Sequence, residues 1–298
     1  MTTQDKTPTM RHNGVNRQSL ILLILMMVLM FDHSSWALQL QRLDIQSGSE
    51  KIEQMILLDA RPQAQWQQNH LPGAFSLSWE DYTRTDSDGV KYRTLPAHEF
   101  APKLAAMGIT PDSTLLIYGD ADTSWGGEGW LAWALAWLGH HGTVYLLDGG
   151  IQAWQQAGLP LNNHTPPLVT VNGAAAYQTE PTCDINISAQ ELARNAESYT
   201  IIDTRNYWTE WLPNHIPGAI HIDWKSFHQG DQHRFIDGQQ LKMLLEKNGV
   251  PLNKPIVYYC TGGIRSGFTW AVHSLTDLPP ALNFEGGIVE WAHYQTNK

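Results

Sequence analysis

Cys260 stands in a stretch whose residue types and spacing could support nucleophilic chemistry. It directly follows the apolar run Ile256–Tyr259 and precedes Thr261, Gly262, Gly263, Ile264 and Arg265. Glycines let a loop turn its backbone N–H groups toward one centre, and a helix after the loop would add the positive end of its dipole. With the Arg265 cation, these features would favour a thiolate, the nucleophilic form of cysteine. We therefore predict a reactive Cys260 rather than an inert buried thiol before a glycine-rich turn.

Alternating strands and helices must position this loop. Short apolar runs such as 56–58, 115–118 and 144–147 are typical of buried parallel strands. Residues 128–138 and 266–275 are predicted as helices. Strands that alternate with helices indicate an α/β fold around a mainly parallel sheet. Cys260 would then lie at the carboxyl end of a strand, where such sheets place ligand sites.

The chain contains an internal repeat. Residues 56–79 resemble residues 200–224, so that Asp59 and Arg61 match Asp203 and Arg205. Farther along, residues 146–154 resemble residues 283–291, and 114–120 align with 255–260. Similarities in the same order predict a duplicated domain. We expect one domain over residues 38–160 and another over 186–298, joined by a proline-containing linker at 161–185.

The N-terminus has the pattern of an export signal. Residues 1–18 are polar with three basic side chains, residues 20–31 are uninterruptedly apolar, and small residues stand at Ser35 and Ala37. The apolar run is shorter than the ~20 residues of a comfortable membrane span. We predict a signal peptide over residues 1–37 and a periplasmic mature protein without membrane attachment. A retained N-terminal anchor is the alternative.

Composition excludes several classes of protein. The 298 residues are 42% hydrophobic and 16% charged, which is typical of a folded chain. The formal net charge is −10, with no run of cations, so nucleic-acid binding is not expected. Two cysteines cannot build a disulfide framework, and Cys183 is interpreted as a free, partly buried thiol. Histidine and cysteine spacing predicts no metal site, and no external cofactor is expected.

These motifs together resemble the rhodanese family in its tandem form, as in thiosulfate and 3-mercaptopyruvate sulfurtransferases. The resemblance covers about residues 45–295. It rests on the Asp-x-Arg strand ends with His-(Leu/Ile)-Pro-Gly-Ala downstream, on Cys-Thr-Gly-Gly-Ile-Arg, and on Gly-Gly-Ile-x-x-Trp near each domain end. It implies two rhodanese-like domains, each a mainly parallel sheet flanked by helices. It also implies that Cys260 takes a sulfane sulfur from a small-molecule donor, becomes a persulfide, and passes the sulfur to cyanide or a thiol.

The resemblance also assigns the other site residues. In the first copy Asp120 replaces the cysteine and a longer loop follows, so that domain is predicted to be inactive. In the second copy, Arg205 is a candidate contact for an anionic substrate, and Trp208 or Trp211 is a candidate pocket wall. His70 and His215, which match in the repeat, are interpreted as structural. The backbone amides expected to cradle the substrate are those of Thr261, Gly262, Gly263, Ile264 and Arg265.

Two other functions are compatible with the sequence. Related phosphatases and arsenate reductases have a Cys-x5-Arg loop, whereas this chain has Cys-x4-Arg, which makes an oxyanion enzyme the weaker alternative. The other alternative is a sulfur-relay or binding module that serves a protein acceptor. The loop has a single cation, Arg265, and matches neither the thiosulfate nor the mercaptopyruvate type, so the donor is left open.

Overall fold

The computed structural model describes residues 38–169 and 177–298. The predicted signal peptide, residues 1–37, and residues 170–176 of the predicted linker lie outside the described residues. Within the described ranges, no helix has the length and apolar character needed to cross a bilayer.

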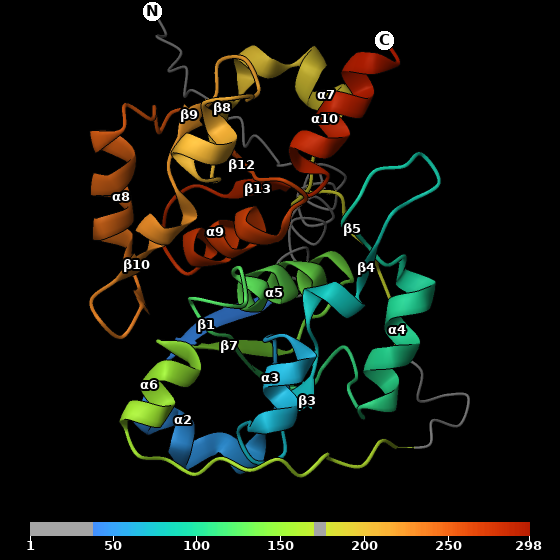
Figure 1. Ribbon diagram of the computed structural model, residues 1–298, viewed down its shortest axis with the longest axis vertical. Helices are drawn as coiled ribbons and strands as arrows, with labels where there is room; N and C mark the ends of the chain where they lie inside the picture. Colours follow the sequence, from blue (N-terminus) through green and yellow to red (C-terminus); the bar gives the residue numbers. More distant parts are fainter. Residues whose placement is uncertain (1–37, 170–176) are drawn as a thin grey trace, which may run out of the picture. The chain divides into compact units, whose positions relative to one another are not determined.

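The first domain is built on a five-stranded parallel sheet (Figure 1). Its strand order is β1-β7-β6-β2-β3, with β1 (Gln39–Leu43), β2 (Ile56–Asp59), β3 (Phe75–Ser76), β6 (Leu115–Tyr118) and β7 (Thr143–Leu147). The helices of this domain are α2 (Ile45–Lys51), α3 (Gln63–Gln68), α4 (Ala97–Ala106), α5 (Gly127–Trp137) and α6 (Gly150–Gln156). A short antiparallel hairpin joins β4 (Thr83–Arg84) to β5 (Arg93–Thr94).

The second domain repeats this plan with four parallel strands. The strand order is β13-β12-β8-β9, with β8 (Thr200–Asp203), β9 (Ile220–His221), β12 (Ile256–Tyr259) and β13 (Ala281–Phe284). The helices are α7 (Ala189–Arg194), α8 (Gly238–Lys247), α9 (Ile264–Ser274) and α10 (Gly287–Thr296), and the hairpin pairs β10 (His228–Gln229) with β11 (Arg234–Phe235). The prediction of two α/β domains with mainly parallel sheets is confirmed.

Helices α5 and α9 pack side by side where the two domains meet (Figure 1). Apart from Glu128 in its first turn, the α5 sequence is apolar on all sides, as expected for a helix covered by protein all round. Glycines bring the two backbones close: a Cβ added to Gly129 would lie 2.4 Å from the Phe268 Cα, and one added to Gly267 would lie 2.9 Å from the Trp130 Cα. One hydrophobic core therefore includes residues from both domains.

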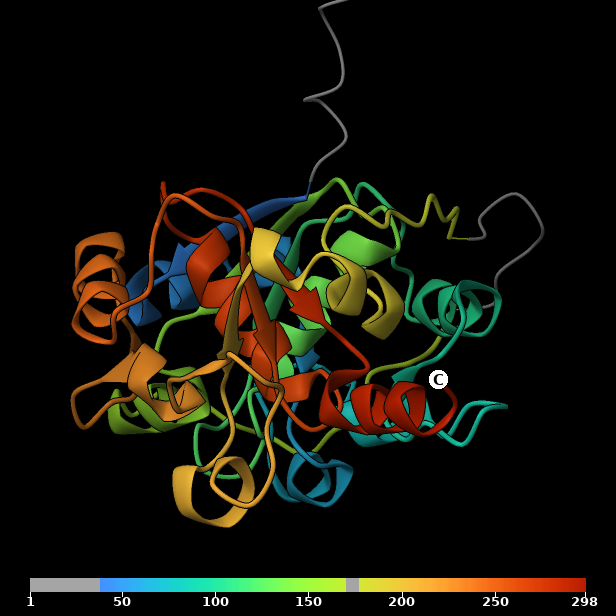
Figure 2. The same ribbon diagram turned by 90° about the horizontal axis from the view of Figure 1, so that it is seen from above.

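The hairpin of each domain contacts the domain-end motif of the other domain. The Thr94 N–H of β5 donates to Glu285 Oε1 at 2.7 Å, and the Phe235 N–H of β11 donates to Asp148 Oδ1 at 2.8 Å. Asp148 and Glu285 occupy matching positions, each directly before the Gly-Gly of the repeated domain-end motif. Figure 2 shows the β4–β5 hairpin beside α10, in keeping with the Arg93–Glu290 ion pair. Each domain thus reaches over the strand ends of the other.

Candidate active site

Cys260 lies where the buried strand β12 ends and four residues before helix α9 begins. Its side chain is buried, with 1% of the residue exposed. Gly263 has φ 86°, a conformation that favours glycine, and a Cβ there would lie 2.5 Å from the Glu285 carbonyl oxygen. Because α9 begins at Ile264, two residues earlier than predicted, Ile264 and Arg265 belong to the first helical turn.

The domain-end motif holds the Cys260 loop from behind. The Ile288 N–H at the start of α10 donates to the Cys260 carbonyl at 2.9 Å, and the Val289 N–H donates to the Thr261 carbonyl at 3.3 Å. Among the described residues, no protein acceptor takes the N–H groups of residues 261–263. These amides and the positive end of α9 are therefore available to an anionic or polarisable group on the Cys260 sulfur.

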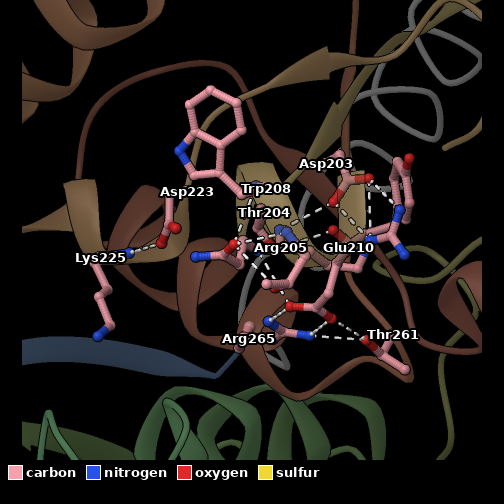
Figure 3. Close-up of polar contacts among 12 residues, drawn as sticks. Asp203, Thr204, Arg205, Trp208, Glu210, Asp223, Lys225, Thr261 and Arg265 are labelled. Atoms are coloured by element: carbon pink, nitrogen blue, oxygen red, sulfur yellow. Dashed lines mark hydrogen bonds and ion pairs between the residues drawn. The ribbon is translucent and has the colours of Figure 1, made fainter. Parts of the chain in front are cut away.

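Arg265 is held by a carboxylate that sequence reasoning did not single out. Its Nη1 and Nη2 donate to Glu210 Oε2 and Oε1 at 2.6 and 2.7 Å, and Nη2 also donates to the Thr261 hydroxyl at 2.8 Å (Figure 3). The Thr261 hydroxyl in turn donates to Glu210 Oε1 at 2.9 Å. Glu210 lies on a five-residue π-helix, Tyr207–Trp211, just after β8. The two hydrogen bonds between Arg265 and Glu210 have the bidentate geometry of a strong Arg–carboxylate pair.

The ionisation of this pair follows from its contacts. Burial alone would raise the pKa of Glu210, but the hydrogen bonds and charge of Arg265 lower it to about 2. Burial would lower the pKa of Arg265, whereas its hydrogen bonds to Glu210 and its interaction with Cys260 raise it above the ordinary value. Both groups are therefore charged at neutral pH.

The first domain provides the aromatic wall of the site. A cavity of about 180 Å³ is lined by Trp79, Tyr92, Trp125, Cys260, Thr261, Gly262, Ile264 and Arg265. Tyr92 and Trp125 have φ of 66° and 56°, values that non-glycine residues rarely adopt and that cluster at functional sites. The Arg265 guanidinium lies 5.7 Å from the centre of the Trp125 ring, within cation–π range.

The structure brings most of the predicted site residues together. Cys260, Thr261, Gly262, Ile264 and Arg265 all line the cavity, and Gly263 shapes the turn beneath it. The predicted aromatic wall is corrected: Trp208 is 73% exposed and points away from the Glu210–Arg265 pair, and Trp211 stacks on His215. The wall comes instead from the other domain, which local sequence patterns do not reveal.

Arg205 has a structural role in the observed geometry. Its Nη2 lies 2.7 Å from Asp203 Oδ2 and donates to the Asn214 carbonyl at 2.6 Å. In the first domain Arg61 makes the same two contacts, with Asp59 and Asn69. Arg205 is not among the residues that line the cavity, because these contacts tie its guanidinium to the strand end. The expected contact with substrate therefore finds no support in the geometry.

In the first domain, the loop that matches the Cys260 loop is occupied by the side chain of Asp120. Asp120, at the position of Cys260, accepts the N–H groups of Asp122 and Thr123 at 2.9 and 3.1 Å through Oδ1. The Gln152 side chain donates to the same oxygen at 3.0 Å. This loop has a carboxylate in place of the thiol, and that carboxylate already occupies the loop amides. These observations favour the prediction that the first domain lacks activity of its own.

Thiols and metal-binding groups complete the inventory of reactive side chains. Cys183 is a free thiol, as predicted, but it is exposed rather than partly buried. The His70 and His215 rings bond to the Trp66 and Trp211 carbonyls within their own turns. No group of three or more His, Cys, Asp or Glu side chains in residues 38–169 and 177–298 is placed to hold a metal ion.

Comparison with known proteins identifies relatives that match most of the described residues. The family described as "Rhodanese-like domain" matches residues 42–157 and 188–294. A probable 3-mercaptopyruvate sulfurtransferase of Pseudomonas aeruginosa is 31% identical over 241 residues, 76% of this chain and 82% of that protein. The sulfur carrier protein TtuD of Thermus thermophilus is 28% identical over 242 residues, 75% of this chain and 82% of that protein. SseA of Escherichia coli, a 3-mercaptopyruvate sulfotransferase, superposes with TM-score 0.70 over 85% of this chain and 99% of its own, and at 20% identity shares the fold.

Proposed function

The chain belongs to the rhodanese family as a tandem sulfurtransferase of rhodanese type, and on this premise we propose that Cys260 carries the transferred sulfur as a persulfide. The observation that supports this most directly is the position of the Cys260 loop. The thiol lies at the carboxyl end of β12, faces a cavity of about 180 Å³, and is followed by three backbone amides without a protein acceptor among the described residues.

The proposed cycle has two displacement steps. The Cys260 thiolate attacks the outer sulfur of a donor such as thiosulfate, the S–S bond of the donor breaks, and sulfite leaves with the bonding electron pair. The amides of residues 261–263 and the N-terminal end of α9 stabilise the resulting persulfide anion. A thiol or cyanide then attacks the outer sulfur of the persulfide, and the Cys260 thiolate is released.

Intact-mass measurement tests this proposal. After incubation with a donor, the wild-type protein should gain about 32 Da, the mass of one sulfur atom, and cyanide should remove it. Cys260→Ser should show no gain. Cys183→Ser is the matched control, because this second free thiol is exposed and should be dispensable. A gain that depends on Cys183, or none with either thiosulfate or mercaptopyruvate on reduced protein, would contradict the proposal.

A sulfur carrier that serves a protein acceptor is the second candidate. It is supported by the similarity to the sulfur carrier protein TtuD. Apolar side chains are also exposed on and beside the π-helix that holds Glu210, namely Tyr207, Trp208 and Leu212. A carrier would load sulfur on Cys260 yet turn over poorly with thiosulfate and cyanide, whereas an enzyme would show saturable turnover.

An oxyanion enzyme is disfavoured at this site. An enzyme of this kind would need Arg265 to hold a phosphate or an arsenate, yet Glu210 already occupies both Nη groups of its guanidinium. A carboxylate beside the substrate would repel a tetrahedral dianion.

We also propose that the protein acts in the periplasm. The support is the N-terminal pattern of a basic segment, the apolar residues 20–31 and small residues before position 38. Fractionation of the expressing cells, with mass measurement of the N-terminus, tests it: a mature chain that begins at Leu38 in the periplasmic fraction is expected. A full-length chain retained in the membrane fraction would favour the anchor alternative.

A further inference from the structure

The charge of the catalytic-loop cation is already balanced. Arg265 forms two charge-assisted hydrogen bonds with Glu210, at 2.6 and 2.7 Å, and the pair has no net charge (Figure 3). The Arg265 side chain is 9% exposed and that of Glu210 is 28% exposed, so solvent screens the pair only in part. Because the pKa of Glu210 is lowered to about 2, its carboxylate stays ionised over the usual assay range. A thiolate at Cys260 would therefore leave the cavity with an excess negative charge.

Nearby cations do not compensate for the excess negative charge that a Cys260 thiolate would bring to the cavity. Arg265 is the one basic side chain among the described residues that line the cavity. Arg93, next to the lining residue Tyr92, pairs with Glu285 and Glu290. A dianion such as thiosulfate would thus meet a thiolate, a neutralised guanidinium and the loop amides. The electrostatic cost of bringing two charges to a thiolate is greater than the cost of bringing one.

The rest of the cavity favours an apolar body. Trp79, Tyr92 and Trp125 form its wall, and Trp79 and Tyr92 meet edge to face with centroids 6.0 Å apart. The Trp125 residue is 53% exposed, at the open side of the cavity. A donor with a flat apolar group would pack on this wall better than a small inorganic dianion.

We propose that Glu210 is a specificity-determining residue: by occupying the Arg265 guanidinium, it selects sulfur donors with at most one negative charge, while the aromatic wall favours donors with an apolar or aromatic body. This inference rests on the proposed persulfide chemistry at Cys260. Organic thiosulfonates and organic persulfides have the required chemistry. The thiolate attacks their outer sulfur, the S–S bond breaks, and a sulfinate or thiolate leaves with the electron pair and one negative charge.

A comparison of two donors across variants tests the proposal. We would measure kcat/KM for thiosulfate and for benzenethiosulfonate, with cyanide as acceptor and thiocyanate as the product detected. Glu210→Gln keeps the side-chain shape and an oxygen acceptor for Thr261, and removes the charge. It should raise the ratio of thiosulfate to benzenethiosulfonate kcat/KM by about tenfold. Comparing this ratio between variants cancels the different intrinsic reactivities of the donors.

Two further variants separate charge from packing. Glu246→Gln removes an exposed carboxylate on α8, where it pairs with Lys242, and should leave the ratio unchanged. Trp125→Leu should lower kcat/KM for benzenethiosulfonate more than for methanethiosulfonate, which has the same charge without the ring. This second effect can be measured even if Glu210→Gln folds poorly.

The outcomes distinguish this inference from the function on which it rests. An unchanged donor ratio in folded Glu210→Gln, or an equal loss for both thiosulfonates in Trp125→Leu, would overturn the specificity proposal alone. Loading of Cys260 by either donor, seen as a mass gain, would at the same time preserve the persulfide function. Absence of loading by these three donors and by mercaptopyruvate would overturn both.

Discussion

A Cβ added to Gly262 in the catalytic loop would lie 2.6 Å from the Cβ of Tyr92 in the first domain. No Cβ fits in this space unless the loop or the Tyr92 segment moves. Tyr92 itself has φ 66°, so the segment that meets the loop is held in a conformation of higher energy. The first domain therefore does more than stabilise its partner: it sets the shape of the cavity over Cys260.

Gly262→Ala is expected to lower both activity and stability. The added methyl group would overpack the contact with Tyr92 and cost about 1–3 kcal/mol in the free energy of unfolding. A shift of the loop amides away from the sulfur should lower kcat/KM by at least about tenfold. Urea denaturation and steady-state kinetics of the persulfide reaction measure the two effects.

Combining Gly262→Ala with substitutions of Tyr92 tests whether the close approach of the two Cβ positions causes the effect. In a Tyr92→Gly background, Gly262→Ala should cost little, because the opposing Cβ is gone. In a Tyr92→Ala background the cost should remain, because alanine keeps the Cβ that lies 2.6 Å away. Equal rescue by both backgrounds would show that the ring, and not the close backbone approach, decides the effect.

The reciprocal hairpins are expected to contribute unequally to stability. Arg93 Nη1 lies 2.5 Å from Glu285 Oε2, and burial raises the pKa of that carboxyl. Arg93→Ala would leave a buried carboxylate with less compensation and should cost about 1–3 kcal/mol, after discounting for the 30% exposure of Arg93. Urea denaturation followed by tryptophan fluorescence measures this loss.

Arg234→Ala is the matched control from the other hairpin. Arg234 is 41% exposed and lies 3.7 Å from Asp148, so its loss should cost less than about 1 kcal/mol. Equal losses in the two variants would mean that the two hairpins support the domain interface equally, contrary to the observed difference in burial and distance.

The features that were predictable from sequence are those set by local order along the chain. The local order places Cys260 at the carboxyl end of a parallel strand, because the cysteine follows a strand and precedes two glycines and a helix. This placement does not depend on the rest of the fold. The duplicated motifs fixed the two-domain plan in the same way, since each copy contains its own strand end and turn. The repeat shows the Asp-x-Arg pattern but not the contact with the Asn214 carbonyl that occupies the Arg205 guanidinium, so the structural role of Arg205 was not predictable.

The features that were not predictable depend on irregular backbone or on the other domain. Tyr92 and Trp125 reach the cavity from a hairpin and a loop of the first domain, and both have positive φ. Glu210 reaches Arg265 because the segment after β8 forms a π-helix, which no periodicity in a five-residue stretch could indicate. The clue available in the sequence was a lone carboxylate between two tryptophans, which by itself is uninformative.

Asp120 is expected to stabilise the first-domain loop without any role in sulfur transfer. Asp120→Ala would leave the Asp122 N–H and the Gln152 amide without this acceptor, whereas the Thr123 N–H would keep the Asp120 carbonyl, so the cost should be about 0.5–1.5 kcal/mol. Asp120→Asn keeps an oxygen in place and should cost less. Differential scanning calorimetry measures the losses, and the mass gain at Cys260 should be the same in both variants. A loss of loading in the folded Asp120→Asn protein would give this loop a part in the reaction.

Glu128 makes stability depend on pH in a defined direction. It lies in the first turn of α5, and its Oε2 is buried without a hydrogen-bond partner among the described residues. Burial raises the pKa of this carboxyl from 4.5 to about 7. The folded protein therefore holds the Glu128 proton more tightly than the unfolded chain does. The stabilising contribution is complete below pH 4.5 and is lost as the pH rises through 7.

Glu128→Gln should consequently stabilise the protein at alkaline pH and do little at acidic pH. At pH 8 the wild-type chain must either ionise a buried group or hold its proton against the solution, whereas glutamine stays neutral. A pKa difference of this size corresponds to a gain on the order of 3 kcal/mol at pH 8, shrinking toward zero near pH 4.5. Urea denaturation of both proteins at pH 5 and pH 8 measures it. A variant that is less stable at pH 8 would show that the folded protein stabilises the Glu128 anion. A difference that does not change with pH would show that folding does not raise the pKa of Glu128.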